Sequence, residues 1–272
     1  MKYKIIFSDI DGTLLNKERQ LSVSTISEIK KLKNKIPFIL ISARMPAAMR
    51  HLQKELEIEE LPIISYNGGL IIVNNVTVST TEIPVNIIEH LNKWNTNLNC
   101  HLSLYHNDEW YVPSMDYWAK REENNTKISP NVKIGEDVIA KWKTESKGAH
   151  KIMAMGEVDQ IDQIVAFLSK EYPKDLHLYR SKSTYLEISP KSISKLTAIK
   201  YLLEQHFNFT LNDVIAYGDN YNDVEMLNHV GFGVAVGNAR EEAKLVANHI
   251  TALSIEDGVA KSLQKLIPLE NW

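Results

Sequence analysis

Short apolar runs alternate with helix-like segments in the first third of the chain. The runs Tyr3–Phe7, Ile36–Ile41 and Pro62–Tyr66 are rich in β-branched residues and have the length of strands. Their apolar character is nearly continuous, which is typical of strands that are buried on both faces. Because helix-like segments separate them, the pattern predicts a parallel sheet covered by helices on both faces.

Helical spacing of apolar positions marks the segments between these strands. One helix is predicted over Ser24–Lys35, where Thr25-Ile26-Ser27-Glu28 has the form of a capping box. A second is predicted over Pro46–Leu56, with proline in its first turn. The same alternation returns near the C-terminus, with helices over 195–207, 221–229, 239–247 and 257–267 and strands at Asp213–Tyr217 and Phe232–Val236.

The middle of the chain has a different pattern, in which strands and helices are mixed. Helices are predicted near Val85–Thr96 and Asp159–Glu171, and four of the five tryptophans lie in this part. The predicted strands are Cys100–Tyr105, Trp110–Val112, Lys151–Met155, Leu176–Tyr179 and Tyr185–Ile188. We therefore expect a doubly wound α/β domain, formed by residues 1–82 and 189–272, and an α+β domain inserted at 83–188.

Composition is that of an ordinary globular protein and excludes several classes. Of the 272 residues 44% are hydrophobic and 24% charged, and the net charge is −3. No basic patch of the kind that binds nucleic acid is visible, and no apolar run approaches the roughly 18 residues that span a bilayer. The single cysteine, Cys100, rules out an internal disulfide. With no signal-peptide pattern, a cytoplasmic location is expected.

Two aspartates follow the first predicted strand, in Asp9-Ile10-Asp11-Gly12-Thr13. Residues at i and i+2 of an extended segment lie on the same side, and the glycine lets the backbone turn close to a ligand. Two like charges held together repel, and a divalent cation offsets that cost. The pair therefore favours a magnesium-bound carboxylate site with one nucleophilic member, although a DxDG sequence also occurs as a simple turn.

A second acidic cluster, Gly218-Asp219-Asn220-Tyr221-Asn222-Asp223, follows a later strand. One helical turn aligns Asp219 with Asp223 if a helix begins here. Helix N-capping is the structural alternative, but a cap does not require three further polar residues. The cluster therefore indicates a magnesium site.

Two more residues lie at equivalent places. Ser42 ends the second strand, where a hydroxyl and the neighbouring amides of a small-residue turn can hold a phosphoryl oxygen. Lys195 lies at the head of a helix and can neutralise phosphate charge. Each has a common structural alternative, a turn or cap for the serine and a solvated position for the lysine.

Together these segments resemble the four motifs of the haloacid dehalogenase-like phosphatases, and most closely the Cof-type subfamily with its large inserted cap. The resemblance covers nearly the whole chain and depends on both the motifs and their order. The matching segments are DIDGTLL at 9–15, SYNGG at 65–69, LEISPKSISK at 186–195, GDNYNDVEML at 218–227, VAVGNA at 234–239 and EDGVA at 256–260.

The resemblance implies an α/β fold with a Rossmann-like core, in which the first strand lies between the second and the fourth. It implies hydrolysis of phosphoric monoester bonds through an aspartyl-phosphate, with Asp9 as nucleophile and Asp11 as general acid and base. Mg²⁺ is then expected on the Asp9 carboxylate, the Asp11 backbone carbonyl and Asp219, with Asp223 orienting metal-bound water. The residues expected to hold the phosphoryl group are Ile10, Ser42, Ala43, Lys195 and Asn222. Asn67-Gly68-Gly69 follows a strand at the same edge of the sheet and is a further candidate.

The chain departs from the family pattern at two places. Cof-like proteins often have Thr-Gly-Arg where this chain has Ser42-Ala43-Arg44. Serine keeps the hydroxyl, while alanine makes the turn less permissive. A glycine often follows the lysine, and here the residue is Leu196, so the direction of Lys195 is less determined than that of the aspartates.

Substrate choice is expected to depend on the cap. The resemblance implies small phosphorylated metabolites, such as sugar phosphates, pyridoxal phosphate or flavin mononucleotide. A phosphomutase with the same nucleophile and a non-catalytic sensor of phosphorylated ligands are the alternatives, and neither nucleic acid nor membrane is an expected partner. The sequence does not distinguish a monomer from a homodimer. Candidate cap residues, for most of which sheet packing is the simpler role, are His101, Tyr105, His106, Trp110, Tyr111 and Trp118.

Overall fold

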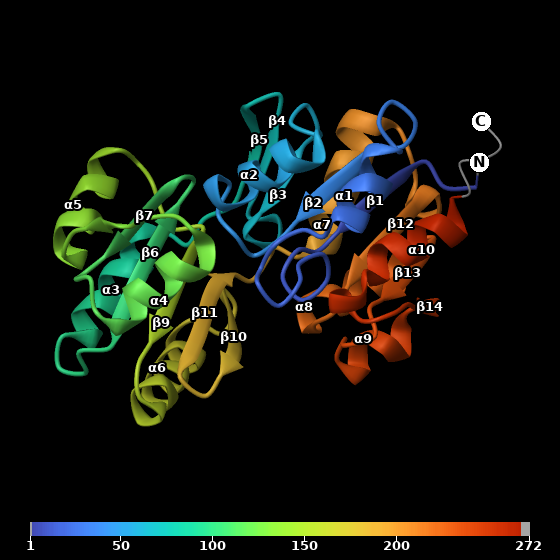
Figure 1. Ribbon diagram of the computed structural model, residues 1–272. Helices are drawn as coiled ribbons and strands as arrows, with labels where there is room; N and C mark the ends of the chain where they lie inside the picture. The colour runs from blue at the N-terminus through green and yellow to red at the C-terminus, as the bar shows by residue number, and fades with distance from the viewer. Residues whose placement is uncertain (1, 268–272) are drawn as a thin grey trace. The chain divides into compact units, whose positions relative to one another are not determined.

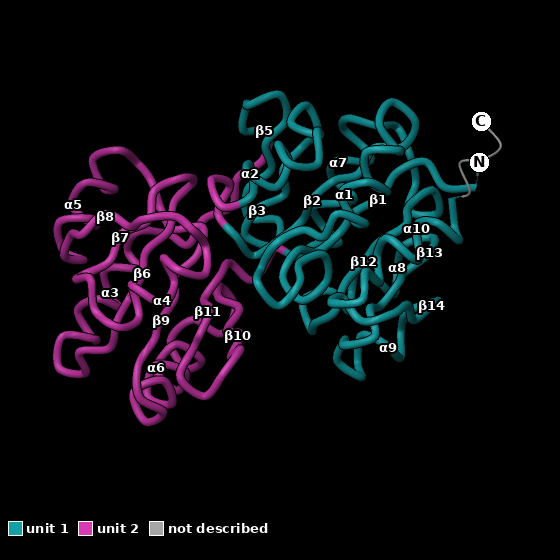
Figure 2. Tube along the Cα trace, in the orientation of Figure 1, with its two compact units in different colours: residues 1–44, 49–78, 194–272 teal, residues 45–48, 79–193 magenta. Residues whose placement is uncertain are grey.

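The chain forms two compact units, each described here by itself (Figure 2). The structure is a computed structural model that describes residues 2–267. The first unit comprises residues 1–44, 49–78 and 194–272, and the second comprises 45–48 and 79–193. The chain therefore leaves the first unit and returns to it.

An eight-stranded sheet forms the centre of the first unit, in the order β14-β13-β12-β1-β2-β3-β4-β5 (Figure 1). Neighbouring strands run parallel from β14 to β3, which confirms the predicted α/β class. The strand β4 then pairs antiparallel with β3, because a tight turn reverses the chain between them. The bounds are β1 Ile5–Ser8, β2 Phe38–Ile41, β3 Ile63–Ser65, β4 Leu70–Val73, β5 Val76–Thr80, β12 Val214–Gly218, β13 Phe232–Ala235 and β14 His249–Ile250.

The first strand lies between β2 and β12, as the family resemblance implied. All four of its residues are buried, and Ser8 is paired with Tyr217 of β12 and with Leu40 of β2. The carboxyl ends of three strands therefore meet at one edge of the sheet, which is where ligands bind in open α/β sheets.

Helices flank this sheet, α1 packing with α10 and α7 with α8 (Figure 1). The first helix begins earlier than predicted: its N-cap is Ser22, whose Oγ accepts the amide of Thr25. The box predicted from Thr25 to Glu28 is therefore wrong, because a serine three residues upstream satisfies the same amide. The bounds are α1 Val23–Lys30, α2 Ala47–Leu56 (of which 47 and 48 belong to the second unit), α7 Lys195–Leu202, α8 Tyr221–His229, α9 Glu241–Val246 and α10 Gly258–Leu266.

The second unit is a six-stranded sheet, in the order β10-β11-β9-β6-β7-β8, with helices on it. Leu186 and Ile188 of β11 face a core that α3, α5 and α6 cover, while Tyr185 on the opposite face contacts Trp118 of α4. The bounds are β6 His101–His106, β7 Glu109–Val112, β8 Asn131–Val132, β9 Lys151–Met155, β10 Leu176–Lys182, β11 Tyr185–Pro190, α3 Val85–Asn95, α4 Tyr117–Thr126, α5 Gly135–Thr144 and α6 Val158–Glu171.

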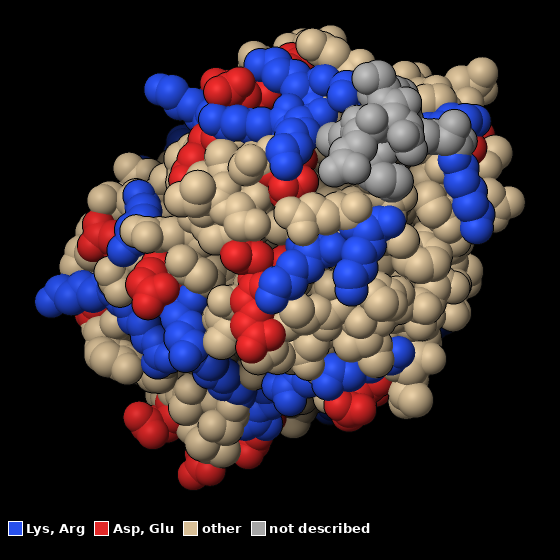
Figure 3. Space-filling view, turned by 45° about the vertical axis from the view of Figure 1, so that its right-hand side comes forward, with Lys and Arg blue, Asp and Glu red and all other residues tan. Residues whose placement is uncertain are grey.

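Two further properties concern membrane-spanning segments and surface charge. Within residues 2–267, no helix combines the length and the apolar character that crossing a membrane requires. On the face shown in Figure 3, Lys and Arg side chains lie among Asp and Glu side chains.

Candidate active site

Asp9 and Asp219 are brought together by the pairing of β1 with β12. The Asp9 amide donates to the carbonyl of Tyr217 at 3.0 Å, which continues the pairing beyond the strand. Gly12 has φ +86°, and a Cβ there would lie 2.3 Å from Asp219 Oδ2. The turn after Asp9 therefore requires glycine for its conformation and for the close approach of Asp219.

Lys195 joins the two acidic motifs. Its side chain is buried, and its Nζ donates to Asp9 Oδ1 at 2.5 Å and to Asp223 Oδ1 at 2.6 Å. Ser194 caps the helix in front of it, accepting the amide of Thr197 at 3.2 Å, and this fixes Lys195 as the first residue of α7. Burial alone would lower the pKa of Lys195, but the charges of Asp223 and Asp9 outweigh that effect and raise it. The lysine is therefore a permanent cation within the site.

Three carboxylates form a compact group around this lysine. Oxygens of Asp9, Asp219 and Asp223 lie within 4.8 Å of one another. Burial raises the pKa of Asp9, with Asp223 adding to the increase, and it raises the pKa of Asp219, where the charge of Asp9 adds to it. One lysine thus leaves negative charge uncompensated, and hard oxygen donors carrying excess charge fit a divalent cation such as Mg²⁺.

Hydrogen bonds fix two members of this group. Asp223 Oδ2 accepts the amides of Asp219 and Asn220 at 2.9 and 3.0 Å, so the protein uses both of its oxygens. Thr13 Oγ1 donates to Asp219 Oδ1 at 3.2 Å. Asp219 is only partly buried, so of Asp219 and Asp223 it is the one more open to a ligand.

The carboxylate of Asp11 is not part of this group and is held by arginine. Arg44 donates to it through two atoms, Nε to Oδ2 at 2.7 Å and Nη2 to Oδ1 at 2.8 Å, and Arg19 lies 3.6 Å away. Burial opposes the effect, but the hydrogen bonds and charge of Arg44 lower the pKa of Asp11. The Asp11 carboxylate therefore stays ionised in this arrangement. Arg44 had been noted only as part of the Ser42-Ala43-Arg44 segment, and its contact with Asp11 could not be inferred from the sequence.

Ser42 and Asn222 both form hydrogen bonds with Asn67 of the turn Tyr66–Gly68. Ser42 is buried at the end of β2, and its Oγ accepts the amide of Arg44 at 3.2 Å. Asn222, in the first turn of α8, donates from Nδ2 to Asn67 Oδ1 at 3.0 Å. Ala43 follows Ser42, and Ile10 is buried between the two aspartates of the first motif. The structure thus places Ile10, Ser42 and Ala43 just beyond adjacent strands, while a hydrogen bond orients Asn222.

The second unit holds another cluster of possible metal ligands, formed by Glu82, His106 and His150. His150 Nδ1 accepts the amide of Asn107 at 3.0 Å, so its Nε2 carries the proton, and that atom lies 2.9 Å from Thr80 Oγ1. A nitrogen that carries a proton has no lone pair for a metal. This cluster is therefore a hydrogen-bond network in the structure described.

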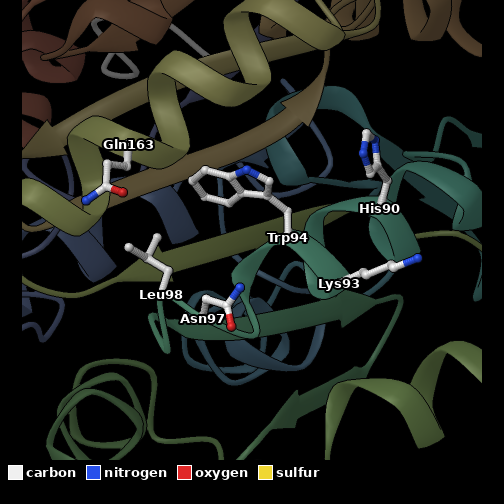
Figure 4. A pocket seen from close by; sticks show the side chains of 6 residues that line it. All are labelled: His90, Lys93, Trp94, Asn97, Leu98 and Gln163. Atoms are coloured by element: carbon white, nitrogen blue, oxygen red, sulfur yellow. The ribbon is translucent and has the colours of Figure 1, made fainter.

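The aromatic residues considered for the cap contribute mainly to packing. Trp110, Tyr105 and Tyr111 are at most 8% exposed. His101 is also buried and bonds Asp116, the N-cap of α4, at 2.7 Å. A separate surface pocket of about 520 Å³ lies between α3 and α6, where the side chain of Trp94 lies between those of Gln163 and His90 (Figure 4).

Known proteins resemble this chain over its full length. A family described as haloacid dehalogenase-like hydrolase matches residues 6–263. A provisionally named phosphatase of Haemophilus influenzae is 37% identical, over 98% of this chain and 100% of that protein. The 5-amino-6-(5-phospho-D-ribitylamino)uracil phosphatase YcsE of Bacillus subtilis is 30% identical, over 96% of this chain and 94% of its own.

A solved structure agrees with these relatives. The crystal structure of a haloacid dehalogenase-like hydrolase from Bacteroides thetaiotaomicron has a TM-score of 0.90 and 27% identity, covering 98% of this chain and 100% of that chain. The fold, the motif order and the sequence relatives all agree, and the chain is a hydrolase that belongs to the haloacid dehalogenase-like family.

Proposed function

We propose that this hydrolase is a magnesium-dependent phosphatase that cleaves phosphate monoesters of small metabolites through an aspartyl-phosphate on Asp9. The observation that carries the proposal is the position of Asp9. Its Oδ1 is fixed by Lys195 at 2.5 Å, and its carboxylate belongs to the group with Asp219 and Asp223. A nucleophile held beside a cation is what in-line phosphoryl transfer requires.

Asp9, Asp219 and the backbone carbonyl of Asp11 are the proposed ligands of Mg²⁺, with Asp223 orienting the water around it. Bound Mg²⁺ supplies a Lewis acid that neutralises charge on the phosphoryl oxygens. Lys195 cancels part of the carboxylate charge, so that a phosphate dianion can approach Asp9. Hydrogen-bond donors proposed for the phosphoryl oxygens are Ser42, the amides of Ala43 and Ile10, and Asn222.

In the first step Asp9 forms a bond to phosphorus and the bond to the leaving alkoxide breaks, while Asp11 gives that oxygen a proton. In the second step water attacks phosphorus, Asp11 takes its proton, and the bond to Asp9 breaks to release inorganic phosphate. The ionised form that Arg44 favours is the form of Asp11 that the second step requires. The first step requires the protonated form, so Asp11 must leave its contact with Arg44 before it gives its proton to the leaving oxygen. The relative named as a 5-amino-6-(5-phospho-D-ribitylamino)uracil phosphatase supports a small phosphorylated metabolite as substrate.

The test is phosphate release from sugar phosphates, pyridoxal phosphate and flavin mononucleotide, each with and without Mg²⁺. Asp9→Asn is the diagnostic variant, and Asp162→Asn, an exposed aspartate paired with Arg180 in the second unit, is the matched control. We expect metal-dependent release that falls by at least about three orders of magnitude in Asp9→Asn alone. Release that survives this substitution would exclude Asp9 as nucleophile, and transfer without free phosphate would indicate a mutase.

A further inference from the structure

The turn Tyr66–Gly68 contacts three of the four motif segments. The amide of Asn67 donates to the carbonyl of Ser42 at 2.8 Å, and its Oδ1 accepts from Asn222 at 3.0 Å. A Cβ at Gly68 would lie 2.7 Å from the carbonyl of Ser194, the residue that caps α7 in front of Lys195. This turn therefore connects the segments that carry the serine, the lysine and the second acidic cluster.

The backbone of this turn is strained. Tyr66 and Asn67 have φ of +52° and +55°, and Gly68 has φ of +105°. Asparagine tolerates the left-handed region, but a tyrosine there costs about 1–2 kcal/mol. Strain of this kind persists where the surrounding contacts hold it, and it concentrates at functional sites. The contacts of Asn67 with Ser42 and Asn222 supply that support.

The amide of Asn222 can face a phosphoryl oxygen in two ways. With Nδ2 directed at Asn67 Oδ1, the first N–H is used and the second remains as a donor in the same region. If the amide turned by 180°, its own oxygen would face the oxygen of Asn67, which is repulsive. The oxygen of Asn67 therefore selects the orientation in which Asn222 presents a donor and not an acceptor to an anion.

We propose that Asn67 is a positioning residue, which orients the Asn222 amide for binding the phosphoryl group. This inference rests on the proposed function, in which Asn222 is one of the phosphoryl donors. If Asn67 has only a structural role, as an asparagine tolerated in a left-handed turn, then Asn67→Gly should bind phosphate as the wild type does. If Asn67 orients Asn222, the same variant should bind phosphate more weakly. Glycine adopts the same φ without strain and removes only the side chain, so Asn67→Gly separates the two roles.

The experiment is a double-mutant cycle of Asn67→Gly and Asn222→Ala. The matched control is Asn208→Gly, which replaces another left-handed asparagine (φ +53°), the C-cap residue after Phe207. Each protein is checked by circular dichroism. Two quantities are then measured: kcat and KM for a substrate that the wild type hydrolyses, and the affinity for inorganic phosphate from its thermal shift, with and without Mg²⁺.

We expect Asn67→Gly to remain folded and to weaken phosphate binding about 10- to 150-fold, since hydrogen bonds to charged groups contribute on this scale. In the kinetic assay the substitution should raise KM more than it lowers kcat. Asn222→Ala should have a similar effect, and the double variant should be no worse than Asn222→Ala alone. Asn208→Gly should bind phosphate as the wild type does. If Asn67→Gly does not fold, Asn67→His provides the comparison, because histidine also tolerates the left-handed region and the substitution removes the amide oxygen.

Wild-type phosphate affinity in Asn67→Gly, no effect of Asn222→Ala, or full additivity in the cycle would each overturn the proposal. These outcomes are distinct from failure of the proposed function, which would appear as a wild type that releases no phosphate or as an active Asp9→Asn.

Discussion

Replacing Lys195 with methionine tests the electrostatic account of the site directly. The Nζ of Lys195 is within 2.6 Å of oxygens on two buried carboxylates, Asp9 and Asp223. Methionine keeps most of the side-chain volume and removes the charge. Because removing one partner leaves uncompensated buried charge, the expected loss in free energy of unfolding is about 3–5 kcal/mol near pH 8. For a unit of this size that corresponds to a fall in Tm of roughly 6–20 °C.

The loss in free energy of unfolding should depend on pH, and the pKa values of Asp9 and Asp219 give the direction of that dependence. Lys195 lowers the pKa of both Asp9 and Asp219, although burial holds both pKa values above their usual range. Without the lysine these pKa values rise further. A group whose pKa is raised by folding stabilises the protein at low pH, and this stabilisation is lost as the pH rises through the folded-state pKa. The variant should therefore differ least from the wild type near pH 5 and most near pH 8.

The assay is urea unfolding without added metal, at pH 5.5 and pH 8, followed by far-UV circular dichroism. Tryptophan fluorescence would report mainly on the second unit, since four of the five tryptophans lie there: Trp94, Trp110, Trp118 and Trp142. The matched control is Lys200→Met, an exposed lysine of the same helix. A loss below about 1 kcal/mol at pH 8, or an equal loss at both pH values, would refute the reasoning.

Two other substitutions test separate parts of the structure. Gly12→Ala adds a Cβ at φ +86° and 2.3 Å from Asp219 Oδ2, so we expect half-maximal activity to need about tenfold more Mg²⁺, as a magnesium titration will show. A variant with the wild-type magnesium requirement would contradict the proposed metal role of Asp219. Burial and the charge of His106 lower the pKa of His150 to about 3 in the folded protein. In the unfolded chain this histidine is protonated below about pH 6.5, so the free energy of unfolding falls as the pH drops below that value. Between pH 7 and pH 5 the wild type should lose about 2 kcal/mol more than His150→Gln in urea unfolding, and equal losses would contradict the assignment.

The sequence predicted well those elements whose ends carry a local signal. The bounds of α8 match the prediction because the polar cluster before it supplies an N-cap, Asn220. The helix α4 was missed, since among its residues only Ala119 is buried and its apolar residues do not form a stripe. The start of α1 was predicted wrongly: a capping box was predicted at Thr25–Glu28, and in the folded chain Ser22 is the N-cap.

The candidate site shows the same division. The motifs and the family resemblance named Asp9, Asp219 and Lys195 as candidates, but the direction of each side chain was not available from the sequence. Arg44 lies 33 residues from Asp11 in the chain, and the pairing of β1 with β2 brings the two into contact. Long-range contacts of this kind depend on strand register, which local sequence does not encode.

The order of strands also has a consequence for synthesis on the ribosome. Asp9 is made before its partner Lys195, which follows 186 positions later in the chain. At about 5–20 residues per second, these two residues are separated by roughly 10–40 s of translation. At the end of that interval residues 79–193 have been made, whereas β12, the neighbour of β1 in the sheet, has not. A nascent chain therefore carries the proposed nucleophile before the lysine that pairs with it has been made.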